Sequence, residues 1–482
     1  ASSALVYAGL LAPLSRAFRA LFPQIAWRLD RDMVEAYAYI VERVRRVTML
    51  GANGRAPAPG EDAVALDWLT RVLKENRGLT GRVSSCALTP MSGGLAGATH
   101  RLALTYEGTT NVGGRQENAD EKNSKSGPPA TLVLKGRHPG WRNRFACFLA
   151  RQYREVLIYR NFPEDLRSML PNHVYAEVRP ALGEWTLVME DLGAKHKDGT
   201  PLTHSVHLLT GCQNFIWTGG SPPDGMTIPK DPPVSEILRI AFAQAAKIHA
   251  RFWGVQNIQK IAGTCRLKGW DWRKGLGRWQ WETGVDAGRE YWAIAKAKKD
   301  VKWNPELVKL VDHAFAKATW QALVGYLQKS PITLVHGDFH AGNMLLENSK
   351  EKSDVGRIFF FDWSEAAAWE GPVDLAQMMI SDIDPDVRRK HEDDLLKHYH
   401  CTLLKNGVDA KAYPLRAVRR AYAHGGLEKW VFLLAVLAGM PLPVSAIQHF
   451  HDQVLSFYLD HRSVVEWNHF TIKSVVPIRS PV

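Results

Sequence analysis

The order of apolar and polar positions along the chain predicts a mixture of strands and helices. Short apolar runs bounded by polar or glycine-rich residues are typical of strands, and they cover residues 84–104, 131–135, 187–192, 334–335 and 358–361. The glycine-rich residues 91–99 interrupt the first run, which therefore predicts a strand, a loop and a second strand. Longer segments with apolar residues at helical spacing predict helices at residues 34–50, 142–162, 235–253, 392–404 and 417–437.

Two regions lie outside this pattern. Residues 108–129 are polar and almost without apolar side chains, so they predict a long flexible insertion. Residues 1–60 form an extension that carries Arg16, Arg19 and Arg28 among leucines, alanines and aromatic residues. This extension fits an interfacial or partner-docking helix, part of a targeting segment, or a helical cover over the rest of the protein. Its apolar stretches between charges are too short to predict a membrane span.

The segment that follows the apolar run 334–335 holds the most informative polar residues. His336, Asp338 and His340 alternate, Asn343 comes five residues after Asp338, and Asp362 comes nineteen residues after Asn343. On a strand the first three would share one face, which would suit a metal hydrolase site of His and carboxylate ligands. A satisfied structural turn is a second interpretation. Neither explains Asn343 and Asp362, whereas carboxylate and amide oxygens are ligands that suit Mg²⁺.

Taken together, these residues resemble the aminoglycoside phosphotransferase and choline-kinase-like superfamily, and in particular its ecdysteroid-kinase-like branch. The resemblance runs from about Pro90 to Asp374. It implies an α+β, bilobal protein-kinase-like fold, with a small antiparallel-sheet N-lobe at residues 61–190 and a larger, mainly helical C-lobe at residues 191–482. It also implies an ATP- and Mg²⁺-dependent phosphotransferase that moves the γ-phosphate to a hydroxyl of a small molecule.

The resemblance assigns roles to residues of the C-lobe. Asp338 would be the catalytic residue that orients and deprotonates the acceptor hydroxyl, and Asn343 and Asp362 would bind the metal ion. His336 and Asp374 would brace the catalytic segment. The Phe-Gly pair that follows the metal-binding aspartate in protein kinases is absent, because Trp363 follows Asp362. This difference favours a small-molecule acceptor over a protein.

The resemblance also implies a nucleotide site in the N-lobe. Glycines of the loop would let backbone N–H groups approach the phosphates, and we assign this role to Gly93, Gly94 and Gly97. Lys135, at the end of the strand 131–135, would bind the α- and β-phosphates, and Glu155 on the next helix would pair with it. Each of these residues taken alone is also consistent with an ordinary turn, strand end or solvated helix charge.

The apolar run 187–192 turns polar at its end. It resembles the hinge of this superfamily, where backbone groups meet the adenine edge, and we therefore include Glu190 and Asp191 among the nucleotide-binding residues. Main-chain atoms suffice for this contact, so the identity of the two side chains says little.

Tryptophans gather in the middle of the predicted C-lobe, at Trp270, Trp272, Trp279, Trp281 and Trp292. In the resembling kinases, helices of this region form the wall of the acceptor site. Tryptophan would suit an apolar acceptor or, by cation–π contact, a cationic one. Ordinary packing between helices explains the cluster at least as well.

Composition narrows the partners and the compartment. A formal charge of +12 suits anionic ligands such as ATP and also permits contact with an acidic membrane surface or protein partner, for which residues 1–50 are the candidate. No nucleic-acid-binding motif is evident. The five cysteines are odd in number and not spaced like zinc ligands, and no Asn-x-Ser/Thr sequon is present. We therefore expect a reducing intracellular compartment, the cytoplasm or an organelle, and not secretion.

A non-enzymatic role is the main alternative to the phosphotransferase. A kinase-like domain can persist as a scaffold or accessory subunit, and the extension and the insertion would add contact surface. Against this alternative, every position expected to carry chemistry holds a competent residue: Lys135, Glu155, Asp338, Asn343 and Asp362.

Overall fold

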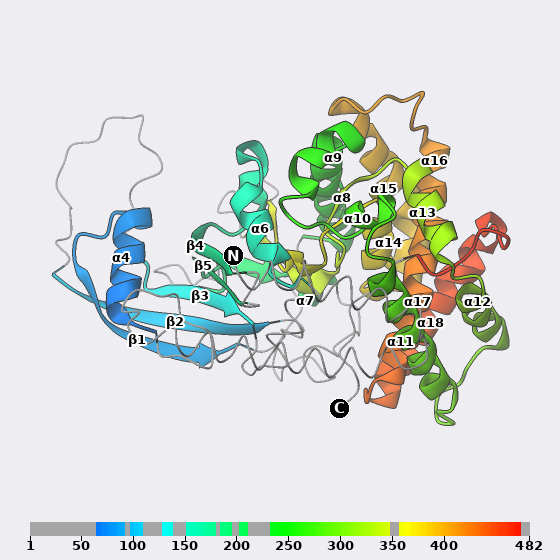
Figure 1. Ribbon diagram of the computed structural model, residues 1–482, viewed down its shortest axis with the longest axis horizontal. Helices are drawn as coiled ribbons and strands as arrows, with labels where there is room; N and C mark the ends of the chain where they lie inside the picture. Colours follow the sequence, from blue (N-terminus) through cyan, green and yellow to red (C-terminus); the bar gives the residue numbers. More distant parts are fainter. Residues whose placement is uncertain are drawn as a thin grey trace, which may run out of the picture. The chain divides into compact units, whose positions relative to one another are not determined.

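The computed structural model describes residues 64–91, 97–108, 128–137, 151–179, 184–194, 202–210, 232–347 and 356–473. They belong to two compact units, one within Ala1–Arg160 and Asn172–Asp191, the other within Asn161–Pro171 and Leu192–Val482. The expected α+β class, with a small antiparallel sheet in one lobe and mainly helices in the other, is confirmed (Figure 1). The expected extension at residues 1–60, most of the expected insertion and the expected helix at 34–50 lie outside the described residues.

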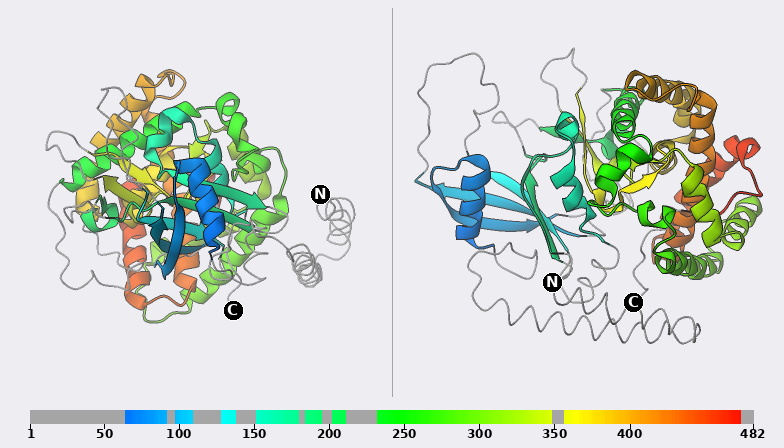
Figure 2. Two further views of the ribbon diagram at one scale, coloured as in Figure 1. Left: turned by 90° about the vertical axis from the view of Figure 1, so that its left-hand side faces the viewer. Right: turned by 45° about the horizontal axis from the view of Figure 1, so that its top comes forward.

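The first unit is built on a five-stranded antiparallel sheet with the order β1-β2-β3-β5-β4. The strands are β1 (Arg82–Pro90), β2 (Ala98–Glu107), β3 (Thr131–Gly136), β4 (His173–Arg179) and β5 (Glu184–Glu190). Helix α4 (Leu66–Arg77) lies on one face of this sheet (Figure 2) and buries Trp68 against Leu132 and Leu134 in a shared apolar cluster. Since side chains of a strand alternate between faces, Lys135 of β3 belongs to the opposite face.

Helix α6 (Arg154–Asn161) covers that opposite face. Its Tyr159 hydroxyl lies 3.7 Å from the sulfur of Met189 on β5, and its Glu155 contacts Lys135 on β3. Of the expected helix at 142–162, the structure describes residues 151–162, which contain α6.

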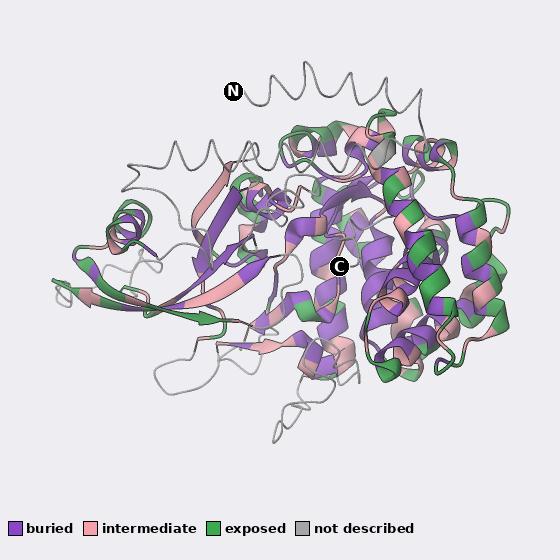
Figure 3. Ribbon diagram, turned by 60° about the horizontal axis from the view of Figure 1, so that its bottom comes forward, coloured by how far each residue is buried: buried purple, intermediate pink, exposed green. Residues whose placement is uncertain are grey.

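The second unit is mainly helical. Its longer helices are α8 (Val234–Arg251), α9 (Val255–Ala262), α11 (Arg278–Lys296), α12 (Pro305–Ala316), α13 (Trp320–Lys329), α14 (Pro372–Ser381), α15 (Pro385–Lys405), α17 (Gly426–Gly439) and α18 (Val444–His461). Shorter ones are η2 (Glu164–Met169), α7 (Val206–Thr210), α10 (Trp270–Arg273), η5 (Ala341–Asn343), η6 (Trp363–Glu365), α16 (Leu415–Arg420), η7 (Ala421–Gly425) and η8 (Arg462–Val464). Figure 3 shows that helices at the periphery of this unit expose one side, drawn in green, while ribbon in its interior is buried. The buried residues of α12 lie along one side only, whereas every residue of α14 is buried.

Two small antiparallel sheets of the second unit hold the loops that contain Asp338 and Asp362. Strand β7 (Thr333–Val335) pairs with β10 (Ala367–Trp369), and β8 (Met344–Glu347) pairs on one side with β6 (Thr203–Ser205) and on the other with β9 (Ile358–Phe360). The loops after β7 and after β9 contain Asp338 and Asp362, respectively. No helix among the described residues is long and apolar enough to cross a bilayer.

Two further helical expectations are confirmed, with details that the sequence pattern did not predict. The expected helix at 417–437 is three consecutive pieces, with the π-helical η7 between α16 and α17. Glycines at this turn let it pack closely on α14: a Cβ at Gly425 would lie 2.8 Å from Val373, and one at Gly426 would collide with Ala376. The expected helix at 392–404 is the later part of α15, which begins earlier because Asp384 caps it by accepting from the Asp386 N–H at 2.9 Å.

Candidate active site

The loop after β7 is fixed by a buried carboxylate. One oxygen of Asp374, at the start of α14, accepts from the His336 N–H at 2.6 Å, and the other accepts from the Gly337 N–H at 3.0 Å. Burial alone would raise the pKa of Asp374, but the hydrogen bond and charge of His249 hold it below its usual range. Gly337 has φ +80°, and a Cβ there would collide with the Glu365 carbonyl, so only glycine fits. Through these two bonds, Asp374 holds the backbone of the loop at His336 and Gly337.

His336 joins this loop to the segment after β9. Its Nε2 donates to the Phe361 carbonyl at 3.0 Å, and its Nδ1 accepts from the Asp338 N–H at 3.3 Å. This arrangement requires the neutral ring, and burial indeed lowers the pKa of His336 although the charge of Asp374 opposes the shift. Because both ring nitrogens are engaged, His336 has no lone pair for a metal ion. Among the residues that the structure describes, no group of three or more His, Cys, Asp or Glu could hold a metal, so the metal-hydrolase interpretation gains no support.

Asp338 lies in a ring of hydrogen-bond donors. Its Oδ1 accepts from Gln377 Nε2 at 2.7 Å, its Oδ2 accepts from Asn343 Nδ2 at 3.2 Å, and His340 Nε2 lies 3.4 Å from the same oxygen. Burial would raise the pKa of Asp338, but the charges of His340 and Lys429 outweigh it and hold the pKa well below the usual range. The side chain is still 38% exposed. The carboxylate is therefore ionised, oriented and accessible to an acceptor hydroxyl.

Asn343 and Asp362 are brought to the same place by strand pairing. Met344 of β8 pairs with Phe360 of β9, so the two candidate ligands flank one end of this hairpin. The Phe361 N–H donates to the Asn343 carbonyl at 3.2 Å, which fixes the neighbouring Asp362. Asp362 has φ 62°, a conformation that residues other than glycine seldom adopt and that is often found at functional sites.

The side-chain amide of Asn343 is oriented by Asp338. Its Nδ2 donates to the Asp338 carbonyl at 3.0 Å as well as to the carboxylate. Since the nitrogen is used in this way, the amide oxygen is the atom presented to other ligands. An amide oxygen and a carboxylate, Asn343 and Asp362, fit the oxygen preference of Mg²⁺.

In the first unit, the expected ion pair is present. Lys135 Nζ lies 2.7 Å from Glu155 Oε2, and both side chains are buried. A buried lysine needs a carboxylate partner to remain charged, and Glu155 on α6 supplies it. β3 and α6 hold this pair, and both of its residues belong to the first unit.

The other nucleotide-binding candidates have structural explanations or lie outside the described residues. Gly93 and Gly94 belong to the undescribed part of the loop. At Gly97 a Cβ would lie 2.7 Å from the Gly136 carbonyl oxygen, so glycine is needed there for the approach of β2 to β3.

At the end of β5, the side chains of the two hinge candidates face other partners in the same unit. Glu190 accepts from the backbone and side-chain amides of Asn172 at 2.7 and 3.1 Å, and Asp191 accepts from Arg101 Nε at 2.7 Å. Only main-chain groups of Glu190 and Asp191 remain candidates for a contact with adenine.

The tryptophans of the second unit mostly serve packing. Trp270, Trp272, Trp281 and Trp292 are all buried. Trp281 donates to the Lys473 carbonyl at 3.1 Å and Trp292 to Asp312 at 2.7 Å, so their N–H groups are used within the helical core. The side chain of Trp279 lies outside the described residues.

Three buried residues around the loop escaped the sequence analysis. Gln377 contacts Asp338, Lys429 of α17 donates to the Gly337 carbonyl at 2.6 Å, and Asp382 accepts from the Ala341 N–H at 3.1 Å. A signal for Lys429 was present, because charged residues are rare inside an apolar helical run. Gln377 lies three residues after Asp374, on the same side of a helix, and that spacing was a second signal.

Comparison with known proteins supports the resemblance seen in the sequence. Residues 286–411 match the family model of the ecdysteroid kinase-like family. The matched part contains the loop around Asp338, both candidate metal ligands and Asp374. The superfamily resemblance is thereby confirmed for this part of the chain. A comparison with curated protein sequences gives no significant match.

Solved structures of three small-molecule kinases are among those similar to this chain. An ethanolamine kinase of Plasmodium vivax is 11% identical with a TM-score of 0.41, over 84% of this chain and 91% of that chain. A choline kinase of Cryptosporidium parvum is 9% identical with a TM-score of 0.43, over 83% and 94%. A thermostable mutant of an aminoglycoside phosphotransferase is 15% identical with a TM-score of 0.35, over 81% and 98%. At this level of similarity neither substrate nor activity is transferred to this chain.

Proposed function

We propose that the protein is an ATP- and Mg²⁺-dependent phosphotransferase that moves the γ-phosphate of ATP to a hydroxyl of a small molecule. The observation that carries the proposal is the arrangement around Asp338, where an ionised, accessible carboxylate lies beside an oriented Asn343 amide and the Asp362 segment. The match of this region to the ecdysteroid kinase-like family supports the same conclusion.

The residues have distinct tasks in the proposed reaction. Asp338 orients the acceptor hydroxyl and takes its proton as the new O–P bond forms and the bond between the γ-phosphorus and its bridging oxygen breaks, with ADP as leaving group. A carboxylate with a low pKa stays charged and can orient the acceptor hydroxyl throughout the reaction. It is a weak base, but in a loose transition state the hydroxyl loses its proton late, so a strong base is not needed. Asn343 and Asp362 would hold Mg²⁺, which neutralises phosphate charge when bound. In the first unit, Lys135 would bind the α- and β-phosphates while Glu155 fixes its ammonium group.

A thermal-shift titration of the full chain with ATP, with and without Mg²⁺, tests the nucleotide site. A ligand that binds only the folded state raises the melting temperature once its concentration exceeds Kd. We expect a Mg²⁺-dependent rise in the wild type and its loss in Asp362→Ala. Release of ADP in the presence of candidate alcohols then tests turnover.

The two experiments also separate the enzyme from a kinase-like scaffold. Binding without ADP release for any acceptor, together with stoichiometric co-purifying partners, would favour the scaffold. No shift at millimolar ATP, in protein with a cooperative melting transition, contradicts the proposed function.

A further inference from the structure

We propose that Gln377 and Lys429 are positioning residues that hold the Asp338 carboxylate in its working orientation. The kinetic consequence of this inference rests on the proposed phosphotransferase function, but its geometry does not. Neither residue was expected from the sequence.

The three side chains form a chain of directed hydrogen bonds. Lys429 Nζ donates to Gln377 Oε1 and, at 2.6 Å, to the Gly337 carbonyl. Gln377 Nε2 in turn donates to Asp338 Oδ1 at 2.7 Å. An amide can present either its oxygen or its nitrogen to a neighbour, but an ammonium group can only donate. Lys429 therefore fixes the Gln377 oxygen on its own side and the NH₂ group on the side of Asp338.

The burial of Lys429 argues against a role in packing alone. The residue is 5% exposed on α17, in a helix whose neighbouring positions are mostly apolar, and Gln377 is 3% exposed on α14. A buried ammonium group is costly, and an apolar side chain of similar length would pack there at lower cost. Burial lowers the pKa of Lys429, and the charges of Asp374 and Asp338 oppose that shift. Its hydrogen-bond acceptors, the Gly337 carbonyl and the Gln377 amide oxygen, lie in and beside the Asp338 loop.

The other side-chain contacts of Asp338 are longer and lie on its second oxygen, Oδ2, so Gln377 is the residue that fixes Oδ1. Asn343 donates to Oδ2 at 3.2 Å and His340 lies 3.4 Å from that oxygen, whereas the Gln377 bond to Oδ1 is 2.7 Å. Without it, Oδ1 loses its direct side-chain donor among the described contacts, and the carboxylate can turn about its last torsion. Displacement of a reacting group by about 1 Å can reduce the rate about 100-fold.

Two substitutions of similar shape test the proposal in the full chain. Gln377→Met and Lys429→Met remove the hydrogen bonds while keeping side-chain length. With Mg²⁺-ATP as the probe and water or an alcohol as acceptor, we expect kcat for ADP release to fall about 10- to 100-fold in each. The KM for ATP and the Mg²⁺-ATP thermal shift should remain as in the wild type. The double variant should lose no more than the stronger single variant, because the two residues act as one unit.

Matched controls separate positioning from general damage to the core. Gln453→Met removes a buried glutamine that donates to the Ile383 carbonyl at 3.0 Å, and Lys298→Met removes an ammonium group that donates to the Met440 carbonyl at 2.7 Å. Both controls should keep the wild-type kcat. An unchanged kcat in Gln377→Met, or losses in the two singles that multiply in the double variant, would overturn the proposal.

Crystal structures of the wild type and Gln377→Met decide the inference even if the wild type does not turn over ATP. We expect the Asp338 carboxylate to rotate or to occupy several orientations in the variant only. The same single orientation in both proteins contradicts positioning by Gln377. Absence of ADP release from the wild type would instead count against the proposed function, so the two failures are distinguishable. Should Lys429→Met fail to fold, Gln377→Met carries the test alone.

Discussion

At the scale of single residues, Asp338 combines a very low pKa with an accessible carboxylate. The donors around the carboxylate, among them Gln377 and Asn343, stabilise its negative charge. Replacement by Asn keeps the shape but removes the charge and the proton acceptor. We expect Asp338→Asn to lower kcat by about 10²- to 10⁴-fold, the usual contribution of a proton-transfer residue.

ADP-release kinetics check this prediction, and a retained Mg²⁺-ATP thermal shift shows that the nucleotide site is intact. Asp393→Asn, on the exposed side of α15 where Asp393 pairs with Arg419, is the control and should leave kcat unchanged. Equal kcat values for Asp338→Asn and the wild type would remove Asp338 from the mechanism.

His336 makes stability depend on pH in a defined direction. Burial lowers its pKa in the folded protein, whereas in the unfolded chain it titrates near its ordinary value of about 6.5. Below that pH the unfolded state binds the extra proton first. The stability contributed by neutral His336 is therefore complete above about pH 6.5 and is lost as the pH falls through the folded pKa.

As the pH falls below about 6.5, we expect the melting temperature of the wild type to fall more steeply than that of His336→Gln. Gln can still donate to the Phe361 carbonyl but does not titrate. The comparison cancels the contributions of the other histidines. Parallel pH profiles for the two proteins would show that His336 is not the group responsible.

The sequence could predict those site residues whose neighbours are near in the chain. Asp338 and Asn343 lie within one loop, and the β8–β9 hairpin brings the Asp362 segment beside them, as the family resemblance implied. Lys429 is different, because its contact with Gly337 depends on the packing of α17 against α14. That packing brings Gly425 and Gly426 close to α14, and no local pattern reveals it.

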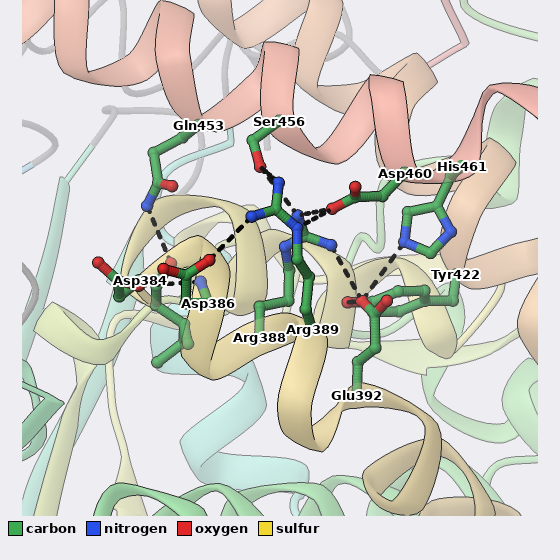
Figure 4. Close-up of polar contacts among 11 residues, drawn as sticks. Asp384, Asp386, Arg388, Arg389, Glu392, Tyr422, Gln453, Ser456, Asp460 and His461 are labelled. Carbon is green, nitrogen blue, oxygen red and sulfur yellow. Dashed lines mark hydrogen bonds and ion pairs between the residues drawn. The ribbon is translucent and has the colours of Figure 1, made fainter.

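At the scale of elements, α15 and α18 are joined by a buried arginine. Arg388 of α15 is 1% exposed and donates to Asp460 and, at 3.1 Å, to Ser456 on α18, while its other nitrogen bonds to Glu392 at 3.2 Å (Figure 4). Its guanidinium group also lies 5.1 Å from the ring centre of Phe457. The helix pattern predicted the later part of α15 but could not predict its partner on α18.

The neighbouring Arg389 offers a matched comparison. It shares Asp460 and Ser456 with Arg388, but its side chain is 46% exposed. Arg388→Ala removes a buried guanidinium group together with its bonds to both helices, although Asp460 keeps Arg389 as a partner. We therefore expect it to lower the unfolding free energy by about 1.5–3 kcal/mol, the usual range for hydrogen bonds to charged groups. Arg389→Ala should cost less than about 1 kcal/mol, because exposed pairs contribute little. Urea unfolding followed by tryptophan fluorescence measures both, and equal losses would show that burial of Arg388 is not decisive.

At the scale of the whole molecule, residues 470–473 pack into the core of the second unit. Residues 470–473 are buried, and they contact the earlier helices α11, α12 and α17. The Thr471 hydroxyl donates to the Ala314 carbonyl of α12 at 3.3 Å, and the Lys473 carbonyl accepts from Trp281 of α11 at 3.1 Å. The sequence analysis assigned no structure to this segment, because its conformation is set by these distant contacts and not by local propensity.

Within residues 470–473, we expect the contacts of Lys473 to contribute most to stability. Its ammonium group lies 2.5 Å from Glu428 of α17 and 4.5 Å from the ring centre of Tyr326 on α13, and both charged side chains are buried. Lys473→Met leaves the Glu428 carboxylate without this partner in the core, at an expected cost of about 3–5 kcal/mol in unfolding free energy. A second change, Glu428→Leu, removes the stranded charge, although the Thr471 N–H then loses its acceptor. We therefore expect the double variant to be more stable than Lys473→Met alone in urea unfolding. A double variant that is less stable than the single one would mean that Glu428 stabilises the fold chiefly through the Thr471 backbone and not through the ion pair.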